Sequence, residues 1–204
     1  MGKENALKHV VIIPDGNRRW AREKMLKPWE GHSRAGSYES VKKILDEARK
    51  LGIKYLSVWG FSTENWKRDK KEIYEIFKIL KNLVIECRKD AMKEKIRFVH
   101  VGRKDRLPHE LLEEIKNLEN ETKEFEDFCV VLCLDYGGKD EIVRAVNEAI
   151  EKGRKVTEDS FNHYLDTKEI PEPDLIIRAG GEKRLSGFKP FQSVYSEIYF
   201  TEKY

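Results

Sequence analysis

The sequence predicts an α/β fold in which one central, mainly parallel β-sheet of about six strands is covered by helices on both faces. The first observation is that short apolar runs alternate with longer segments whose apolar residues recur every three or four positions. The second is that polar or glycine-rich stretches close the apolar runs, as expected where strands end. The third is size, because 204 residues without a repeat or a long linker are enough for one continuous core. We therefore predict a single domain over residues 1–204.

The first half of the chain shows this alternation clearly. An apolar run at 9–13 predicts the first strand, and the spacing of apolar residues predicts a helix over 33–50. A second strand is expected at 55–61. Asp69 is placed to cap a long helix over 70–94. That helix carries a continuous apolar stripe: Ile73, Ile76, Phe77, Leu80, Leu83, Val84 and Cys87.

The second half continues in the same way. In chain order, the pattern predicts a strand at 96–101, a helix after Pro108, a strand at 129–134, helices at 140–152 and 158–165, and strands at 174–178 and 194–200.

The charges are nearly balanced, which narrows the classes of function. The chain has 40 Lys and Arg against 37 Asp and Glu, a net charge of +3, whereas general nucleic-acid binders usually carry a strong basic excess. No apolar run approaches the roughly 18 residues of a membrane span, and the N-terminus lacks a signal-peptide core. The three cysteines have no metal-ligand spacing and are expected to be buried free thiols. We therefore expect a cytoplasmic protein that does not bind nucleic acid.

Four polar or glycine-rich stretches are expected to meet at one mouth. They are 15–20, 62–68, 135–138 and 178–186, and each follows a predicted strand. In parallel sheets ligands bind beyond the carboxyl ends of the strands, so these stretches should form one site.

The mouth combines a single well-placed acid, Asp15, with many cations. Arginine binds phosphate through a bidentate fork. Magnesium typically takes one or two carboxylates and leaves its other positions to phosphate oxygens and water. Asp15 among arginines therefore predicts a Mg²⁺–diphosphate site. The side chains expected there are Arg18, Arg19, Arg68, Arg178 and Arg184, His32, Ser62, Thr63 and Ser186, and Trp20 and Trp66.

Several other phosphate chemistries are excluded by missing motifs. The glycines at 31 and 36 have the spacing of a P-loop, but the chain continues with Ser37 and Tyr38 instead of Lys and Ser or Thr. No G-x-G-x-x-G follows a strand. The position two residues before Asp15, where an aspartyl phosphatase would have a second acid, is Ile13. The D-D-x-x-D motif of trans-prenyltransferases is also absent.

Several of these residues also have an ordinary structural interpretation. Asp15 is a suitable helix cap, and Trp20 and Trp66 are equally consistent with packing. Most of the 73–87 stripe is expected to be core, since any helix on a sheet needs an apolar face. Arg106 is interpreted as a solvated surface residue.

The chain resembles the cis-prenyltransferases, the undecaprenyl (polyprenyl) diphosphate synthase family. The resemblance spans residues 9–200 and rests on six segments in order: H-V-V-I-I-P-D-G-N-R-R-W, G-H-S-R-A-G, F-S-T-E-N-W-K-R, D-Y-G-G-K-D-E-I-V, D-L-I-I-R-A-G-G-E-K-R-L-S and Y-S-E-I-Y-F.

This resemblance implies a Mg²⁺-dependent homodimeric transferase. It would condense isopentenyl diphosphate with an allylic prenyl diphosphate, giving a cis-polyprenyl diphosphate used as a precursor of a glycosyl-carrier lipid. The hydrocarbon product requires an apolar tunnel between sheet and helices, with residues 73–87 as one wall, and would be delivered at a membrane surface.

The resemblance also implies roles for individual residues. Asp15 would hold Mg²⁺ and assist loss of the allylic diphosphate, and Glu197 matches a second metal-linked acid. Asn65 is assigned to the proton-abstraction step, although a neutral amide is a poor base and is better suited to position a diphosphate or a water. The residues implied to bind substrate are Gly16, Asn17, Arg18, Arg19, Trp20 and His32, then Ser62, Thr63, Glu64, Trp66 and Arg68 of a catalytic loop, and Arg178, Arg184 and Ser186.

Three features depart from the family pattern. Pro28 stands where many members have an arginine, and Lys27 is a candidate to supply the missing charge. Asp135 stands where the family usually has Asn. The sequence ends at Tyr204, whereas family members normally continue with an arginine-rich tail that reaches the partner subunit's site. Two alternatives therefore stay open: a non-catalytic or regulatory subunit of a heteromeric enzyme, and a prenyltransferase that uses a different acceptor.

Overall fold

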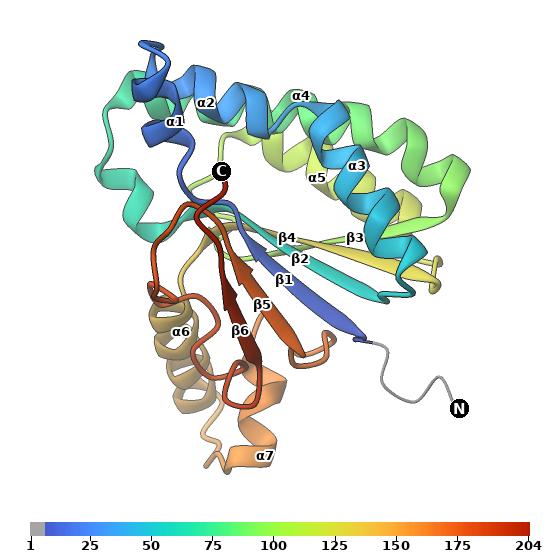
Figure 1. Ribbon diagram of the computed structural model, residues 1–204. Coiled ribbons are helices and arrows are strands. Elements are labelled where there is room, and N and C mark those ends of the chain that lie inside the picture. The colour runs from blue at the N-terminus through green and yellow to red at the C-terminus, as the bar shows by residue number, and fades with distance from the viewer. Residues whose placement is uncertain (1–6) are drawn as a thin grey trace.

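The computed structural model describes residues 7–204. Its centre is a six-stranded sheet in the order β3-β4-β2-β1-β5-β6, and every neighbouring pair is parallel (Figure 1). The strands are β1 (His9–Ile13), β2 (Tyr55–Ser62), β3 (Ile96–Val101), β4 (Phe128–Tyr136), β5 (Leu175–Arg178) and β6 (Glu197–Phe200). The predicted domain of residues 1–204 includes residues 1–6, which lie outside the described part.

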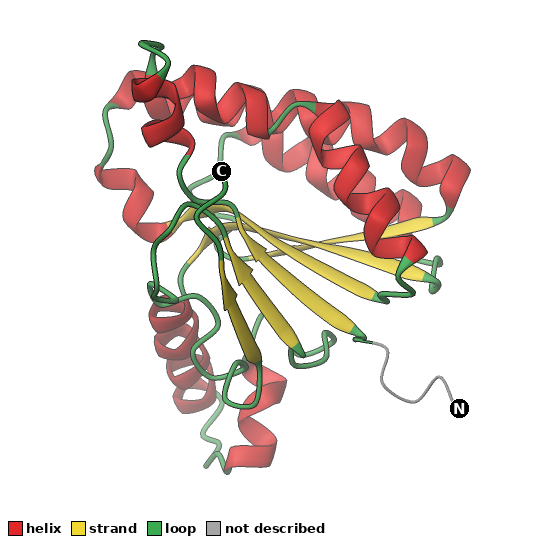
Figure 2. Cartoon of the chain, in the orientation of Figure 1, coloured by secondary structure: helices red, strands yellow, loops and turns green. Residues whose placement is uncertain are grey.

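Helices cover both faces of the sheet, which confirms the predicted fold class (Figure 2). One face carries α1 (Asn17–Glu23), α2 (Pro28–Ala35), α3 (Tyr38–Lys50), α4 (Lys70–Glu94) and α5 (His109–Thr122). The other face carries α6 (Gly138–Glu151) and α7 (Glu158–Phe161). Two short 3₁₀ helices are η1 (Thr63–Lys67) and η2 (Asn162–Tyr164). Within residues 7–204, no helix combines the length and the apolar character needed to cross a bilayer.

The predicted boundaries match best where a local signal is strong. Strands β1 and β3 have the predicted bounds. Helix α4 begins after Asp69, whose carboxylate accepts hydrogen bonds from the backbone N–H groups of Lys71 and Glu72. The three cysteines are free and buried, as expected.

The helix predicted over 33–50 is wrong in its first part. It is two helices, because α2 ends at Ala35 and α3 begins at Tyr38 after a new cap. The Ser37 side chain accepts from the backbone N–H of Ser40, which starts the second helix in a new direction. The last strand is also shorter than predicted, because a turn closed by the Ser196 N–H to Ser193 O hydrogen bond occupies its expected beginning.

The apolar stripe of α4 divides into two groups. Ile73, Phe77, Val84 and Cys87 are buried in the core, and Phe77 packs its ring against Phe61 and Trp66. The second group, Ile76, Leu80 and Leu83, lines an apolar cavity of about 130 Å³ between the sheet and helices α3 and α4. The opposite walls are supplied by β1, β2 and α3 through Ile12, Leu56, Val58, Val41, Ile44 and Leu45.

The opposite face of the sheet holds a lysine that the sequence analysis did not single out. Lys189 is 1% exposed, and its Nζ donates to Ser57 Oγ at 2.9 Å. Ser57 Oγ lies 2.8 Å from His9 Nε2, and His9 Nδ1 lies 2.7 Å from the Pro171 carbonyl oxygen. That carbonyl can only accept, so Nδ1 carries the hydrogen and Ser57 donates to Nε2. Burial lowers the pKa of Lys189.

Replacing Lys189 with methionine should stabilise the protein near neutral pH. The folded pKa lies below the value of about 10.4 for an unfolded lysine. Between the two values the unfolded chain binds more protons, so wild-type stability rises with pH in that window. Lys189→Met should remove this rise and increase stability by about 1 kcal/mol or more, roughly 2–4 °C in Tm. Thermal unfolding from pH 6 to 10 measures both effects, and the exposed Lys155→Met is the control. A lower Tm for Lys189→Met at all pH values would contradict the prediction.

Candidate active site

Three of the four predicted stretches, 15–20, 62–68 and 178–186, line cavities at the carboxyl ends of the strands, whereas 135–138 packs behind them. Ile13 of β1 pairs with Arg178 of β5, and Ser62 of β2 pairs with Tyr136 of β4, so the residues that follow lie along one edge. Two adjoining polar cavities of about 700 and about 380 Å³ open there. Both are lined by Pro14, Asp15, Asn17, His32 and Arg68.

Asp15 lies between β1 and α1 and does not cap that helix. The N-cap of α1 is Gly16, without a side-chain hydrogen bond. Asp15 Oδ2 accepts from Arg178 Nη2 at 2.8 Å, Oδ1 accepts from the Gly16 N–H at 2.6 Å, and Arg19 Nη2 lies 3.7 Å from Oδ1. Burial by itself would raise the pKa of Asp15, but these donors and the charges of Arg178 and Arg19 outweigh it and lower the pKa. Asp15 is therefore an ionised carboxylate facing a polar cavity.

Two glycines allow the turns after β1 and β5 to approach each other. Gly16 has φ 97° and Gly180 has φ 80°, both in the left-handed region. A Cβ on Gly180 would lie 2.8 Å from the Asp15 backbone, and a Cβ on Gly16 would lie 2.2 Å from the Tyr204 ring. A larger residue at position 180 would push the Asp15 backbone away from its place beside Arg178.

A buried carboxylate that the sequence analysis missed organises the cations on the other wall. The Glu72 side chain on α4 is only 5% exposed. Its Oε1 lies 3.2 Å from Arg68 Nη1, 3.3 Å from His32 Nε2 and 3.6 Å from Arg18 Nε. The sequence feature that could have identified Glu72 is its position in the helix. Glu72 precedes Ile76 by one helical turn, so it lies on the apolar face of α4.

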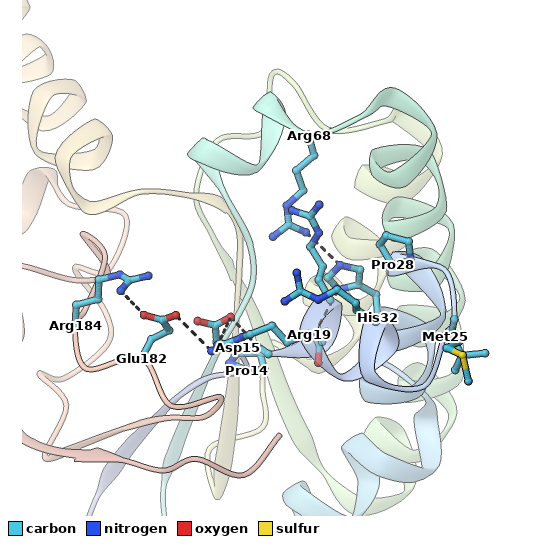
Figure 3. A pocket seen from close by; sticks show the side chains of 14 residues that line it. Pro14, Asp15, Arg19, Met25, Pro28, His32, Arg68, Glu182 and Arg184 are labelled. Carbon is cyan, nitrogen blue, oxygen red and sulfur yellow. Dashed lines mark hydrogen bonds and ion pairs between the residues drawn. The ribbon is translucent and has the colours of Figure 1, made fainter.

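His32 is a neutral imidazole in this cluster. Burial, followed by the charge of Arg68, lowers the pKa of His32 and outweighs the effect of Glu72. Its Nδ1 lies 3.4 Å from the Asn17 amide nitrogen. Figure 3 shows His32 and Arg68 together on one wall, facing Asp15 and Arg19.

The third group comes from the loop after β5. Arg178 donates to Ser186 Oγ at 2.8 Å and to the Arg184 carbonyl oxygen. Glu182, which the sequence analysis did not select, contacts Arg184 and lies 3.4 Å from Arg19 Nη1 (Figure 3). Arg184 and Glu182 line the larger cavity, whereas Arg178 and Ser186 line the smaller one.

The predicted catalytic loop is divided between the cavity and the core. Ser62, Glu64, Asn65 and Arg68 line the smaller cavity, and Asn65 Oδ1 accepts from the Ser62 N–H at 3.1 Å. The other two predicted residues of the loop, Thr63 and Trp66, are absent from the lining of both polar cavities.

These two side chains pack against the end of β4. Thr63 packs against Gly137, where a Cβ would lie 2.3 Å from Thr63 Oγ1. The Trp66 ring lies against Phe61 and Phe77. The geometry of this chain therefore favours the packing interpretation of Trp66.

Trp20 lies outside the polar cavities. It lines a separate, mostly apolar pocket of about 310 Å³, where Arg34 lies over its ring at 5.4 Å. Asp135 does not face the mouth as an open acid, because its side chain is fully buried.

Glu197 does not join Asp15 within one chain. Glu197 begins β6 and pairs with Leu175, whereas Asp15 follows Ile13 at the other end of the sheet. A metal ion held by both acids of the same chain is therefore incompatible with the register. Across residues 7–204, no group of three or more His, Cys, Asp or Glu side chains is arranged to hold a metal. A single carboxylate, that of Asp15, fits the kind of magnesium site predicted from the sequence, in which phosphate and water supply the other ligands.

Pro28 lines the larger cavity without a substitute for the arginine of the family pattern. Lys27 is exposed to solvent, and its Nζ lies 5.4 Å from the Trp29 ring centroid. It is not among the residues that line the cavity.

Comparisons with known proteins identify the family. Residues 13–204 match the family described as "Putative undecaprenyl diphosphate synthase". The chain is 41% identical over 201 residues to an isoprenyl transferase of Fusobacterium nucleatum, covering 98% of this chain and 86% of that protein. It is 40% identical over 195 residues to that of Aquifex aeolicus, covering 95% and 84%.

Two solved structures share the fold. A lavandulyl diphosphate synthase from Lavandula x intermedia, solved in complex with dimethylallyl diphosphate, superposes with a TM-score of 0.91 at 33% identity, covering 97% of this chain and 88% of that one. A probable undecaprenyl diphosphate synthase from Campylobacter jejuni gives a TM-score of 0.82 at 34% identity, covering 97% and 86%. The protein is thus a prenyl-transferring enzyme. It belongs to the undecaprenyl diphosphate synthase, or isoprenyl transferase, family of cis-prenyltransferases.

Replacing Glu72 with glutamine should destabilise the ligand-free protein. Arg18, Arg68 and His32 would lose their shared carboxylate, at a cost of about 1–3 kcal/mol. Inorganic diphosphate should then stabilise Glu72→Gln more than wild type, because the added anion relieves the repulsion. Thermal unfolding with and without magnesium diphosphate measures this, and Glu86→Gln, exposed on the same helix, is the control. An unchanged Tm of the ligand-free variant would show that Glu72 does not organise the cluster.

Proposed function

We propose that the chain is a Mg²⁺-dependent enzyme that condenses isopentenyl diphosphate with an allylic prenyl diphosphate. The product would be a longer cis-polyprenyl diphosphate, a precursor of a glycosyl-carrier lipid, made by one catalytic domain over residues 1–204. The observation that carries the proposal is the contact between the polar and apolar cavities. Pro14, Asn17 and His32 line both the larger polar cavity and the apolar cavity under α4. A ligand with a diphosphate head and a hydrocarbon tail fits this junction.

The allylic diphosphate is assigned to the larger polar cavity. Arg18, Arg19 and Arg68 present guanidinium groups there, next to the neutral His32 and the Asn17 side chain. As the carbon–oxygen bond breaks, the electron pair leaves with the diphosphate and negative charge develops on it. Fixed cations around the leaving group lower this barrier directly. Magnesium, when bound at Asp15, would supply further charge neutralisation.

Isopentenyl diphosphate is assigned to the smaller cavity. Arg68, Ser62 and Ser186 line it, and Arg178 is oriented there by Asp15 and Ser186. In the condensation, a carbon–carbon bond forms to the allylic carbon and a proton leaves the isopentenyl unit. Asn65 faces this cavity, and its amide is suited to orient a diphosphate or a water that takes the proton.

The apolar cavity bears on product length. A volume of about 130 Å³ is close to that of an engineered cavity of about 150 Å³ that binds benzene, so it accommodates roughly one five-carbon unit. Longer chains require side chains of α3 or α4 to move. The neighbouring apolar pocket of about 310 Å³ shares Ile12, Ala35 and Ile44 with this cavity and offers further space.

A homodimer is part of the proposal, and the sheet edge supports it. β6 has a strand neighbour on one side only. Ile198 is 42% exposed and Tyr199 59%, and the preceding Tyr195 is 90% exposed. An apolar edge of this kind is typical of a protein–protein contact. The enzyme would act in the cytoplasm and deliver its hydrophobic product at the membrane surface.

The purified protein should extend allylic primers when given labelled isopentenyl diphosphate and Mg²⁺. Asp15→Ala should abolish product formation while the circular dichroism spectrum at the assay temperature stays unchanged. The Tm should fall, because Arg178, whose side chain is 5% exposed, loses its carboxylate partner. Loss of activity on chelation of Mg²⁺ and its recovery on readdition test the metal.

The same assay separates the proposal from a regulatory subunit. Absence of product with every primer, from a folded wild-type chain, would favour a non-catalytic partner of an active homologue. The retained Asp15 and site arginines support catalysis instead.

A different acceptor is the second candidate, and one observation favours it. The lavandulyl diphosphate synthase superposes with a TM-score of 0.91, and the apolar cavity is close in size to one five-carbon unit. The chain could therefore join two short allylic units. Determination of product connectivity by NMR discriminates the two, since head-to-tail cis products would exclude this candidate.

Narrowing the apolar cavity should shorten the product. Leu83 lines the cavity from α4, and Leu83→Trp would fill much of it. The main product should lose at least one isoprene unit, while consumption of the first isopentenyl diphosphate falls less than about threefold. Mass spectrometry of extracted lipids gives the chain lengths. Tyr74→Trp, on the exposed side of the same helix, is the control. The same length distribution in Leu83→Trp and wild type would place the growing chain elsewhere.

A further inference from the structure

The end of β4 holds a buried acid with three donors. Asp135 is fully buried and has φ 48°. Arg106 binds it bidentately, with Nε 2.8 Å from Oδ2 and Nη2 2.5 Å from Oδ1. The indole Nε1 of Trp66 donates to Oδ1 at 2.8 Å. Asp135 thus joins two segments distant in sequence, the loop before α5 and the helix η1.

Trp66 is held on several sides by this arrangement. The guanidinium carbon of Arg106 lies 5.6 Å from its ring centroid. The rings of Phe61 and Phe77 each lie 5.4 Å from it. The indole is therefore fixed by its N–H bond to Asp135, by the stacked cation and by two aromatic neighbours.

Trp66 has two neighbours that face the smaller polar cavity, one within η1 and one at its C-cap. Asn65 precedes Trp66 in the same short helix, and Arg68 follows two residues later. Both line the smaller polar cavity, whereas Trp66 points into the core. Because η1 spans only five residues, a shift of the indole moves the side chains that face the cavity.

A carboxylate suits this position better than an amide. Three N–H donors reach the two oxygens of Asp135. An asparagine would offer one acceptor oxygen, and its NH₂ group would face either Arg106 or Trp66 as a second donor. The acid at position 135, which departs from the usual family residue, is therefore matched to Arg106.

We propose that Asp135 and Arg106 are positioning residues for the prenyl-transfer reaction, holding Asn65 and Arg68 in place through Trp66. This inference rests on the proposed function. Neither Asp135 nor Arg106 lines the two polar cavities, so the effect of the ion pair passes through the indole. Without it η1 loses its anchor, and the two side chains sample positions away from the bound diphosphate.

Arg106→Gln tests the proposal, with Arg88→Gln as the matched control. The Arg88 side chain is 35% exposed, against 37% for Arg106, and it also binds a carboxylate bidentately, that of Glu121 between α4 and α5. Well below both melting temperatures, Arg106→Gln should lower kcat by about tenfold or more with a smaller change in KM. Hydrogen exchange of the amides at 63–68 should accelerate by about tenfold. Arg88→Gln should change neither quantity.

A second variant separates positioning from stability. Trp66→Phe keeps the aromatic packing but removes the N–H donor, and it should accelerate exchange in the same amides. In the double variant Arg106→Gln/Trp66→Phe, the fold-loss in kcat should be smaller than the product of the fold-losses of the two single variants. Both substitutions break the same connection between Asp135 and η1. Unchanged exchange at 63–68 in Arg106→Gln would overturn the proposal. If wild type makes no product but this exchange still accelerates, the proposed function fails and the anchoring of η1 stands.

Discussion

The ion pair between Asp15 and Arg178 is the interaction on which the site depends. Asp15 follows β1 and Arg178 ends β5, so the pair joins two neighbouring parallel strands at their carboxyl ends. Gly180 lets the two turns approach closely, because a Cβ there would lie 2.8 Å from the Asp15 backbone. The pair also orients Arg178 toward Ser186. Arg178 therefore links the loop after β5 directly to the turn before α1.

The roles of the charged groups in this protein follow how deeply each side chain is buried. Asp15 and the arginines face open polar cavities and stay available to a ligand. Glu72 lies deeper and balances cations that would otherwise repel one another. Asp135 lies deepest, where its charge is matched by Arg106 and its geometry fixes an indole. The cations that line the polar cavities therefore adjoin the apolar interior, and no unpaired carboxylate lies between the two.

The sequence predicted best what local patterns determine. Short continuous apolar runs located the strands, and the Asp69 cap located the start of α4. Contacts between distant segments were not predictable in this way. Arg106 resembled a solvated residue, and Trp66 was equally consistent with packing and with ligand contact, because their partner Asp135 lies 29 and 69 residues away in the chain. Lys189 was missed for the same reason, since Ser57 is 132 residues away. The distance of Glu197 from Asp15 within one chain was not predictable either, because a motif gives an order along the chain and not a position in the sheet.

The apolar cavity beneath α4 also has a consequence for the volume of the protein. Its roughly 130 Å³ disappears when the chain unfolds, so the unfolded state occupies less space and hydrostatic pressure favours it. A hydrocarbon tail in the cavity would remove most of this difference. How strongly pressure destabilises the fold therefore depends on how completely this cavity is filled.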